Sequence, residues 1–442
     1  MKLKRTLIKE TPGLISQKVR LCGSIQVTRD HGKVIFFDLA DRSGMIQAVV
    51  VANNKDNFEI AKKCRSQYVV ELIGLIKERP GKQKNNEKVT GSVEMEVEQL
   101  KIISAVEGDL PFDVSVKELD LNLETLLDNR NLALRNEKIK SIFKLYSQLL
   151  TSYQQVMTAN DFVEIKTPKI LSAATEGGAN FFKVKYFKRE AVLAQSPQFY
   201  KQMGVGIFER VFEIGPVFRA EPHYTSRHIN EYISFDAEMG YIEGYEDLMD
   251  QLEKVFWKMM KDIKEKCSDI LNLYNATVPN EVKIPRIKLA EALKILEEKY
   301  GKHYDEMDID PEGERLICDY AKEQFGSDLI FLTHYPTGIR PMYTMPCENN
   351  PEESCSFDLI FRGVEILTGG QRIHNYNQLV ESIRKRGMNP EEFKDYLEIF
   401  RYGMPAHGGW AFGSERIVQK ILGLKSIKEA VLYPRDVNRL TP

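Results

Sequence analysis

Charged and hydrogen-bonding residues concentrate in four short runs of the 442-residue sequence: Gln195–Gln202, Phe218–Glu231, Phe357–His374 and Gly408–Arg416. Three of the runs contain arginines, whose guanidinium groups pair bidentately with phosphate oxygens and so suit a bound triphosphate. The third run also holds carboxylates that suit Mg²⁺, a metal that commonly shares phosphate oxygens with its ligand. The runs therefore predict a site for phosphate chemistry.

Signatures of other mechanisms are absent from the sequence. It has no P-loop, no G-x-G-x-x-G after an expected strand, and no Ser or Cys nucleophile elbow. A single arginine or glutamate on a strand is more often a surface or ion-pair residue than a ligand. Four such runs in one chain nevertheless favour a common site.

The elements that must position these runs are expected after residue 135. The third run is expected to end a strand at Gly369-Gly370, where backbone can approach a ligand closely, and the fourth to open a helix with a glycine-rich turn. Periodicity predicts a helix at 136–160, then strands at 163–165, 191–194, 210–221, 232–242 and 356–366, and helices at 245–267, 287–299, 311–325, 390–402 and 414–422. Because strands and helices do not alternate strictly, we expect an α+β domain on an antiparallel sheet flanked by helices.

The first 104 residues differ from the rest in pattern and charge. Five alternating segments, at 19–27, 34–39, 45–51, 67–74 and 92–103, predict a small barrel of the OB type, whose strand face commonly binds oligonucleotides. Residues 1–104 carry a charge of +7 and the remainder −9, so the first module suits a polyanionic partner. Residues 105–135 show little periodicity and are interpreted as a hinge or linker.

Composition narrows the class of protein. The six cysteines form no C-x-x-C pair, so reduced thiols are expected rather than a disulfide or zinc framework. No apolar stretch reaches the roughly 18–20 residues that span a bilayer, and the first ten residues have no secretory h-region. We expect a cytoplasmic protein that does not enter a membrane.

With these residues in view, the sequence resembles class II aminoacyl-tRNA synthetases, most closely their aspartyl group in its compact archaeal-type form. Residues 162–168 resemble motif 1, which builds the dimer interface in that family; 212–231 resemble motif 2, and 409–422 motif 3. The resemblance implies an OB-fold anticodon-binding domain at 1–104, the linker at 105–135 and a catalytic domain at 136–442. It also implies a homodimer.

The resemblance assigns the second and fourth runs to ATP and Mg²⁺. Arg219 is expected on the α-phosphate and Arg416 on the γ-phosphate, with Glu365 completing the catalytic set. The implied ATP-binding residues are Arg219, Ala220, Glu221, Arg227, His228, Ile229, Tyr232, Glu365, Gly413, Ser414, Glu415 and Arg416. The implied metal ligands are Glu365, Thr368 and Asp358. Ala411 stands where motif 3 normally has glycine.

The amino acid is assigned by a separate set of residues. Lys201 and Arg372 would form a two-cation clamp for a side-chain carboxylate, rejecting asparagine because its amide would leave buried charge unpaired. The implied L-aspartate site comprises Glu176, Ser196, Gln198, Lys201, Arg219, Asp236, Thr368 and Arg372. Two alternatives stay open: an asparaginyl-tRNA synthetase, and a non-catalytic paralogue that only binds tRNA.

The first module is assigned to the tRNA anticodon. Arg29, Phe36 and Gln47 match the family's anticodon contacts, which requires Phe36 to face outward; alternation with Phe37 alone cannot choose between them. Gln26 and Pro80 lie where archaeal-type enzymes discriminate tRNA(Asp) from tRNA(Asn). The expected reaction is ATP-dependent transfer of aspartate to tRNA(Asp), with tRNA(Asn) left open as a second substrate.

Overall fold

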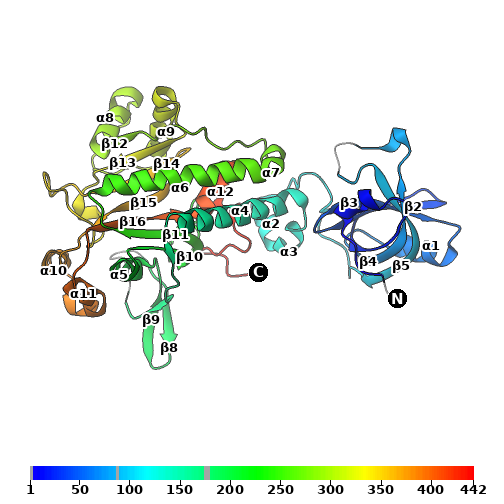
Figure 1. Ribbon diagram of the computed structural model, residues 1–442, viewed down its shortest axis with the longest axis horizontal. Helices are drawn as coiled ribbons and strands as arrows, with labels where there is room; N and C mark the ends of the chain where they lie inside the picture. The colour runs from blue at the N-terminus through cyan, green and yellow to red at the C-terminus, as the bar shows by residue number, and fades with distance from the viewer. Residues whose placement is uncertain (1–2, 86–88, 174–179) are drawn as a thin grey trace. The chain divides into compact units, whose positions relative to one another are not determined.

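The computed structural model describes residues 3–85, 89–173 and 180–442 (Figure 1). The chain divides into two compact units. The first contains Met1–Asp120 and Arg135–Glu137, and the second contains Leu121–Leu134 and Lys138–Pro442. Each unit has its own hydrophobic core.

The first unit is a closed five-stranded barrel in the order β1-β2-β3-β5-β4. Alternate residues of its strands point inward, as in β2, where Ile35, Phe37 and Leu39 are fully buried. The strands are β1 (Lys18–Asp30), β2 (Val34–Asp41), β3 (Gly44–Val51), β4 (Val69–Glu78) and β5 (Val93–Ser104), with helix α1 (Lys55–Lys63) and 3₁₀ turns η1 (Ile8–Leu14) and η2 (Gly81–Gln83). The predicted OB-type barrel is confirmed; α1, which the sequence analysis did not assign, starts at the cap residue Asn54.

The second unit is built on one eight-stranded sheet in the order β12-β13-β14-β15-β16-β11-β10-β6. Its strands are β6 (Val163–Glu164), β10 (Arg210–Phe218), β11 (Glu231–Gly240), β12 (Arg286–Lys288), β13 (Leu329–Thr333), β14 (Ser356–Phe361), β15 (Val364–Arg372) and β16 (His407–Gly413). Neighbours pair antiparallel except β12 with β13 and β10 with β6. The predicted α+β fold is confirmed, with parallel pairs at the two edges.

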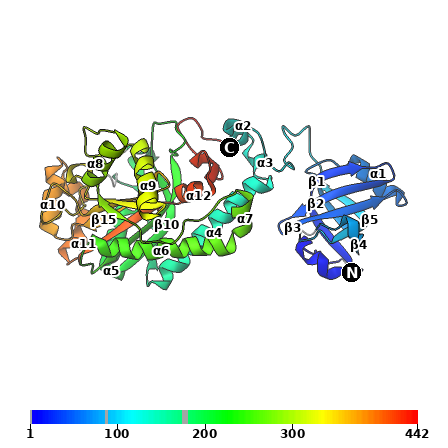
Figure 2. The same ribbon diagram turned by 90° about the horizontal axis from the view of Figure 1, so that it is seen from above.

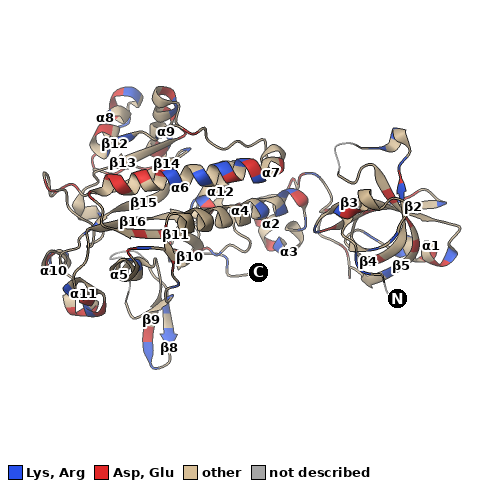
Figure 3. Ribbon diagram, in the orientation of Figure 1, with Lys and Arg blue, Asp and Glu red and all other residues tan. Residues whose placement is uncertain are grey.

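Two long helices, α4 (Glu137–Ala159) and α6 (Tyr245–Lys266), cover one face of this sheet (Figures 1 and 2). They bury an apolar layer that includes Tyr153, Phe256 and the sheet residues Phe235 and Trp410. Acidic residues open α6 and lysines close it, which favours the helix dipole (Figure 3). The opposite face of the sheet is left for other contacts.

The remaining elements surround this sheet. They are α2 (Leu123–Asp128), α3 (Arg130–Ala133), α5 (Gln198–Phe208), α7 (Ser268–Leu273), α8 (Leu289–Tyr300), α9 (Pro311–Phe325), α10 (Tyr376–Lys385), α11 (Lys394–Arg401), α12 (Ser414–Leu422), the 3₁₀ turns η3 (Thr337–Ile339), η4 (Pro390–Phe393) and η5 (Ile427–Ala430), and a small sheet of β7 (Ile170–Leu171), β9 (Arg189–Leu193) and β8 (Lys183–Tyr186). In the described part of the chain, no helix is both long enough and apolar enough to cross a membrane.

The end of the predicted linker is helical. Residues 121–134 belong to the second unit and form α2 and α3. Asn122 caps α2 by accepting a hydrogen bond from the Thr125 N–H at 2.8 Å. Buried Arg130 of α3 donates to the carbonyl of Leu432 at 2.8 Å. These helices are too short to show periodicity, and long-range contacts hold them.

The glycines expected at a strand end and in a turn before a helix, Gly369 and Gly409 among them, lie inside strands. Residues 356–366 form a hairpin, β14 and β15, that turns at Arg362 and Gly363, both with positive φ. Gly369 lies within β15, where a Cβ would come 2.5 Å from the Phe357 ring. Gly409 lies within β16, where a Cβ would come 2.0 Å from the Ala237 carbonyl oxygen. The expected strand end and glycine-rich turn are wrong because close packing, not turn formation, requires these glycines.

Candidate active site

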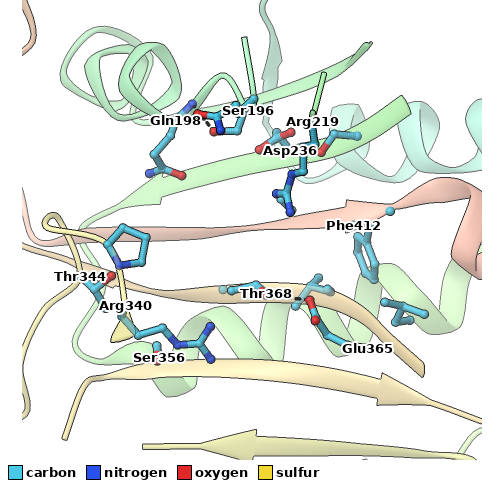
Figure 4. A pocket seen from close by; sticks show the side chains of 18 of the residues that line it. Ser196, Gln198, Arg219, Asp236, Arg340, Thr344, Ser356, Glu365, Thr368 and Phe412 are labelled. Atoms are coloured by element: carbon cyan, nitrogen blue, oxygen red, sulfur yellow. Dashed lines mark hydrogen bonds between the residues drawn. The ribbon is translucent and has the colours of Figure 1, made fainter. Parts of the chain in front are cut away.

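A cavity of about 820 Å³ lies over the face of the large sheet that α4 and α6 leave open (Figure 4). Side-chain alternation on β11 creates it: Phe235 and Ala237 pack toward the helices, whereas Ser234 and Asp236 line the cavity. A cavity of this size is typical for a small-molecule ligand.

The structure brings most of the predicted site residues together around this cavity. Its lining includes Ser196, Gln198, Lys201, Arg219, Glu221, Arg227, His228, Ile229, Tyr232, Asp236, Glu365, Thr368, Arg372, Gly413, Glu415 and Arg416. Three predicted residues do not line it: Ala220, Asp358 and Ser414. Glu176 lies outside the described residues.

The floor of the cavity is a row of paired residues across three strands. Asp236 of β11 pairs with Ala411 of β16, and Ala411 pairs with Thr368 of β15. Gly413 of β16 pairs with Ser234. Ala411 and Gly413 on the middle strand, β16, have small side chains or none. They leave space between the polar side chains of β11 and β15, and this space suits a flat ligand. The methyl group of Ala411 is accommodated in this row.

One end of the cavity holds a buried array of two cations and two carboxylates. The Lys201 Nζ, on α5, lies 2.9 Å from Asp236 Oδ1 and 3.5 Å from Glu238 Oε2. Arg372 donates from Nε to Glu238 Oε1 at 2.9 Å. All four side chains are at least nine-tenths buried. The predicted pair of cations thus shares one carboxylate, Glu238, which the sequence analysis missed.

Backbone groups and an aromatic ring fix these two cations further. Lys201 donates to the Trp410 carbonyl at 3.1 Å, and Arg372 donates to the Gly409 carbonyl at 3.1 Å. The Arg372 guanidinium lies 5.4 Å from the Tyr343 ring centroid. Burial alone lowers the pKa of Arg372, but Glu238 outweighs it and raises that pKa above its usual value. Arg372 therefore stays charged.

The opposite end of the cavity gathers cations around Glu365. Arg416 donates to the Glu365 carbonyl at 2.7 Å, and its Nη1 lies 3.8 Å from Glu365 Oε2. Thr368 donates from its hydroxyl to Glu365 Oε1 at 2.9 Å (Figure 4). Burial raises the pKa of Glu365, but Arg416, the Thr368 hydroxyl, Arg340 and Arg219 together lower it below its usual value. An ionised carboxylate among arginines suits a metal-bound polyphosphate.

Residues 219–230, here called the motif 2 loop, form one side of this end. Arg227 pairs with Glu314 of α9, whose Oε2 also accepts from the Glu365 N–H at 3.1 Å. Burial raises the pKa of Glu314 despite the charge of Arg227. His228 Nδ1 lies 2.7 Å from the Thr225 hydroxyl, and burial, with help from nearby cations, lowers the pKa of His228. The loop thus presents Arg227 and a neutral imidazole to the cavity.

Asp358, which does not line the cavity, pairs with an arginine that the sequence analysis did not select. Arg340, in the loop before β14, donates from Nη2 to Asp358 Oδ2 at 2.8 Å and lies 3.9 Å from the Tyr335 ring centroid. Burial raises the pKa of Asp358, although Arg340 opposes that shift. The charge of Glu365 adds to that shift, and Asp358 pairs with Thr368 in the β14–β15 register, so the role of Asp358 as a metal ligand stays a prediction. Among the described residues, no cluster of three or more His, Cys, Asp or Glu side chains is grouped to hold a metal.

Two predicted nucleotide contacts, Ser414 and Glu415, also have partners within the fold. The Glu415 carboxylate accepts from the Tyr146 hydroxyl at 2.8 Å and from the Ile233 N–H at 3.0 Å. Ser414 is fully buried and donates to the Ile233 carbonyl at 2.7 Å. Burial raises the pKa of Glu415. These side chains fix the start of α12 against α4 and β11. They therefore position Arg416, which follows them directly on the same helix.

In the first unit, the residues predicted to read the anticodon share one patch on the outer barrel surface. Arg29 pairs with Asp38 at 2.7 Å, and its Nη2 lies 3.4 Å from Gln47 Oε1. Phe36 is opposite Arg29 in the β1–β2 register. The expectation that Phe36 faces outward is confirmed, because Phe37 is fully buried and Phe36 is not.

The two residues predicted to discriminate tRNAs lie elsewhere on the same unit. Gln26 is at a bulge in β1 and contacts Ser24 at 2.8 Å and Gln67 at 3.2 Å. Pro80 is exposed and precedes η2. In the described part of the chain, neither side chain forms a hydrogen bond with Arg29 or Phe36, so any joint action would require a ligand that spans them.

An OB-type barrel joined to a six-strand antiparallel core, with arginines facing a ligand-sized cavity, defines the class II aminoacyl-tRNA synthetase architecture. The family described as "tRNA synthetases class II (D, K and N)" matches residues 122–437. The description "OB-fold nucleic acid binding domain" matches residues 19–103. The chain belongs to the class II tRNA synthetases of the D, K and N group, as its sequence motifs predict.

Individual relatives are similar over nearly the whole chain. A Thermus thermophilus protein named aspartate–tRNA(Asp/Asn) ligase is 42% identical over 99% of this chain and 100% of its own length. A Pyrococcus abyssi protein named aspartate–tRNA(Asp) ligase is 41% identical over 98% of each chain. The crystal structure of asparaginyl-tRNA synthetase from Pyrococcus horikoshii, complexed with asparaginyl-adenylate, has a TM-score of 0.91 and 30% identity, covering 100% of both chains. Because the last resemblance is as complete as the others, fold alone does not select the amino acid.

Proposed function

We propose that this synthetase is an aspartate–tRNA ligase: it activates L-aspartate with ATP and transfers it to the 3′ end of tRNA(Asp). The observation that carries the choice of amino acid is the buried array of Lys201, Asp236, Glu238 and Arg372. Two fixed cations at the end of the cavity suit a second carboxylate on the substrate. The names of the relatives that are about 42% identical support the same assignment.

The charge balance of this array explains how it would choose aspartate. Its two cations and two carboxylates cancel before substrate binds. The α-ammonium group of aspartate would lie against Asp236, with Ser196, Gln198 and Glu176 nearby, and the side-chain carboxylate would lie between Lys201 and Arg372. The ammonium and the side-chain carboxylate of aspartate would then add one positive and one negative charge, so the array would stay balanced. Asparagine would bring the ammonium without the side-chain carboxylate and leave the buried cations poorly matched.

Activation then requires positioning rather than a general base. The α-carboxylate of aspartate is already ionised at neutral pH, so one of its oxygens can attack the α-phosphorus of ATP directly. A new bond forms between that oxygen and phosphorus, the bond from the α-phosphorus to the bridging oxygen breaks, and pyrophosphate leaves. Arg219 would hold the α-phosphate and the attacking carboxylate, and Arg416 would hold the γ-phosphate. Both stabilise charge that develops in the transition state.

The other cavity residues would bind the nucleotide. Tyr232, whose ring centroid lies 5.8 Å from the Arg219 guanidinium, would stack on the adenine ring. Glu221, Arg227 and His228 would contact ATP from the motif 2 loop. In the second step, a terminal hydroxyl of the tRNA attacks the activated carbonyl, the aspartyl ester forms, and AMP leaves.

The predicted metal set suits Mg²⁺. Glu365, ionised and hydrogen-bonded to Thr368, offers the oxygen ligands that the ion prefers. When bound, the ion neutralises phosphate charge. We propose Glu365 and Thr368 as its protein ligands, with Asp358, which also pairs with Arg340, as the further acidic partner.

The first unit would bind the anticodon. Phe36 would stack on a base while Arg29 and Gln47 donate hydrogen bonds to base edges, as single-stranded RNA readout requires. Relatives named for tRNA(Asp/Asn) and for tRNA(Asp) are similarly close, so use of tRNA(Asn) is the open part of the proposal. Charging tRNA(Asp) and tRNA(Asn) transcripts with aspartate side by side tests whether tRNA(Asn) is a substrate. Substitutions at Gln26 and Pro80 should change only the ratio of the two charging efficiencies.

We also infer a homodimer that forms through the motif 1 region and acts in the cytoplasm, where tRNA is charged. Val163 of β6, Ile170 of β7 and Ile207 and Phe208 at the end of α5 are large apolar side chains that are 41%, 52%, 65% and 49% exposed. Exposed apolar groups close to motif 1 suit burial against a second copy. Sedimentation equilibrium tests this inference: a concentration-independent monomer would contradict it.

Amino-acid-dependent exchange of pyrophosphate into ATP tests the proposed function. The wild-type chain is expected to catalyse exchange with L-aspartate and to be at least 100-fold less efficient with L-asparagine. Exchange with asparagine alone would overturn the choice of amino acid. Exchange with none of the twenty amino acids, together with measurable tRNA binding, would favour the non-catalytic alternative.

A further inference from the structure

Residues 427–439, here called the C-terminal segment, lie against the motif 2 loop. The Ile427 N–H donates to the Ser226 carbonyl at 2.9 Å, and the Asn230 N–H donates to the Arg435 carbonyl at 2.7 Å. Ile427 itself lines the cavity. The segment therefore reaches the loop at two backbone points and extends to the edge of the site.

A third contact centres on Lys428. Its side chain is 2% exposed, and its ammonium group lies 2.6 Å from Asp436 Oδ2 within the same segment. That ammonium also lies 3.5 Å from the ring centroid of Tyr224, which belongs to the motif 2 loop. Burial by itself raises the pKa of Asp436, but Lys428 and two backbone N–H groups lower it below its usual value. The Asp436 carboxylate is thus ionised, and the Tyr224 ring covers the Lys428 side of the pair.

Helices α2 and α3 hold the segment from the other side. Buried Arg130 donates to the carbonyls of Val431 and Leu432 at 2.6 and 2.8 Å. Arg439 pairs with Glu124 at 3.0 Å and with Asp128 at 2.7 Å. The Tyr224 hydroxyl also donates to Glu124. The segment and the tip of the motif 2 loop therefore share one support, the start of α2.

The motif 2 loop depends on such supports because it has no regular secondary structure of its own between β10 and β11. It carries Glu221, Arg227 and His228, which line the cavity. Loops without internal structure hold functional side chains in place only when other elements fix them. A desolvated cation over an aromatic ring is one of the stronger contacts available for that purpose.

We propose that Lys428 is a positioning residue for ATP: through Tyr224 it fixes the motif 2 loop, so that the loop side chains meet the nucleotide. The proposal rests on the proposed function, because it assumes that the loop binds ATP during amino-acid activation. It assigns the C-terminal segment a part in the ATP site and none in the buried array of Lys201, Asp236, Glu238 and Arg372, which lies at the other end of the cavity.

The first test replaces the ring and spares the buried ion pair. Tyr224→Leu is expected to raise the KM for ATP about tenfold in pyrophosphate exchange while the KM for aspartate changes less than twofold. Tyr224→Phe keeps a ring over Lys428 and should retain a KM for ATP within about threefold of wild type. Tyr224 is 49% exposed, so neither variant should lower the melting temperature by more than a few degrees. Tyr402→Leu, which changes a tyrosine that is 73% exposed, is the matched control and should leave both constants unchanged.

The second test addresses Lys428 directly. Lys428→Met alone would leave Asp436 buried without its partner, so the variant to measure is Lys428→Met with Asp436→Asn, which removes both charges. This double variant should reproduce the rise in the KM for ATP. Lys428→Arg, which keeps a cation beside Asp436 and Tyr224, should have a KM for ATP close to that of the wild type.

Two results would overturn the proposal: an unchanged KM for ATP in Tyr224→Leu, or equal increases in both KM values accompanied by a large fall in melting temperature. Failure of the proposed function is distinct from these, because then the wild-type chain would show no exchange. In that case, direct titration with ATP would still compare the loop variants: equal ATP affinity in wild type and Tyr224→Leu would overturn the proposal, and weaker binding in Tyr224→Leu would support it.

Discussion

Removing the charge of Lys201 is expected to abolish the preference for aspartate. In Lys201→Met the side-chain length is kept, but Asp236 loses its partner at 2.9 Å, and Glu238 loses a second cation at 3.5 Å. Arg372 then remains as the one cation of the array facing two buried carboxylates. A substrate carboxylate that enters this end of the cavity would meet a net negative charge rather than a balanced set.

The size of the effect follows from the burial of the array. Lys201 and Asp236 are each 2% exposed, so solvent screens their interaction very little. Removing one partner of a buried ion pair costs about 3–5 kcal/mol. If the substrate carboxylate loses a partner of the same kind, kcat/KM for aspartate should fall roughly 10²- to 4 × 10³-fold, since about 1.4 kcal/mol is tenfold. The value for asparagine, which brings no side-chain charge, should fall much less.

Pyrophosphate exchange with both amino acids, together with thermal unfolding, separates selectivity from stability. Lys201→Met with Glu238→Gln restores a balance of one cation and one carboxylate and should recover the melting temperature, but it should not recover the use of aspartate. Lys261→Met, which changes an exposed lysine of α6, is the control for loss of a surface charge. The reasoning is refuted if aspartate and asparagine lose equal amounts of kcat/KM, or if the double variant regains wild-type activity with aspartate.

Three further outcomes are expected. Arg340→Met should lower the free energy of unfolding in urea by about 3–5 kcal/mol, because Asp358 is left as a buried unpaired carboxylate; adding Asp358→Asn should recover most of the loss, and a further loss would contradict the assigned pair. Phe36→Leu should weaken tRNA binding about 5- to 150-fold, the worth of one stacked base, without changing pyrophosphate exchange, whereas Phe37→Leu should lower the melting temperature because that ring fills the barrel core. Asp310→Ala should destabilise the protein by about 1 kcal/mol near pH 7 through loss of the α9 cap. Because folding lowers the pKa of Asp310 from 3.8 to about 2, its ionic contribution is complete above pH 4 and disappears as the pH falls through 2, so melting temperatures of the two proteins should converge there.

Local patterns were sufficient for the elements whose signals are local. Alternation identified the five barrel strands, and periodicity identified α9 and α12. The observed ends of these helices have local causes: Asp310 and Pro311 open α9, and a glycine in the left-handed conformation follows each helix. The motif residues also identified the family, because a ligand that contacts several segments constrains the residue types in each. Short elements such as α2 and α3 gave no comparable signal, since a single turn is too short for periodicity.

The sequence by itself determined the barrel, the α+β class, the family and the identity of most side chains that face the cavity. Only the tertiary structure decided which charges meet. Glu238 joins Lys201 to Arg372, and Arg340 neutralises Asp358, through contacts between segments that are far apart along the chain. The physical reason is that residue type specifies what a side chain can pair with, whereas the partner itself is fixed by strand register, which brought Asp236, Ala411 and Thr368 into one row.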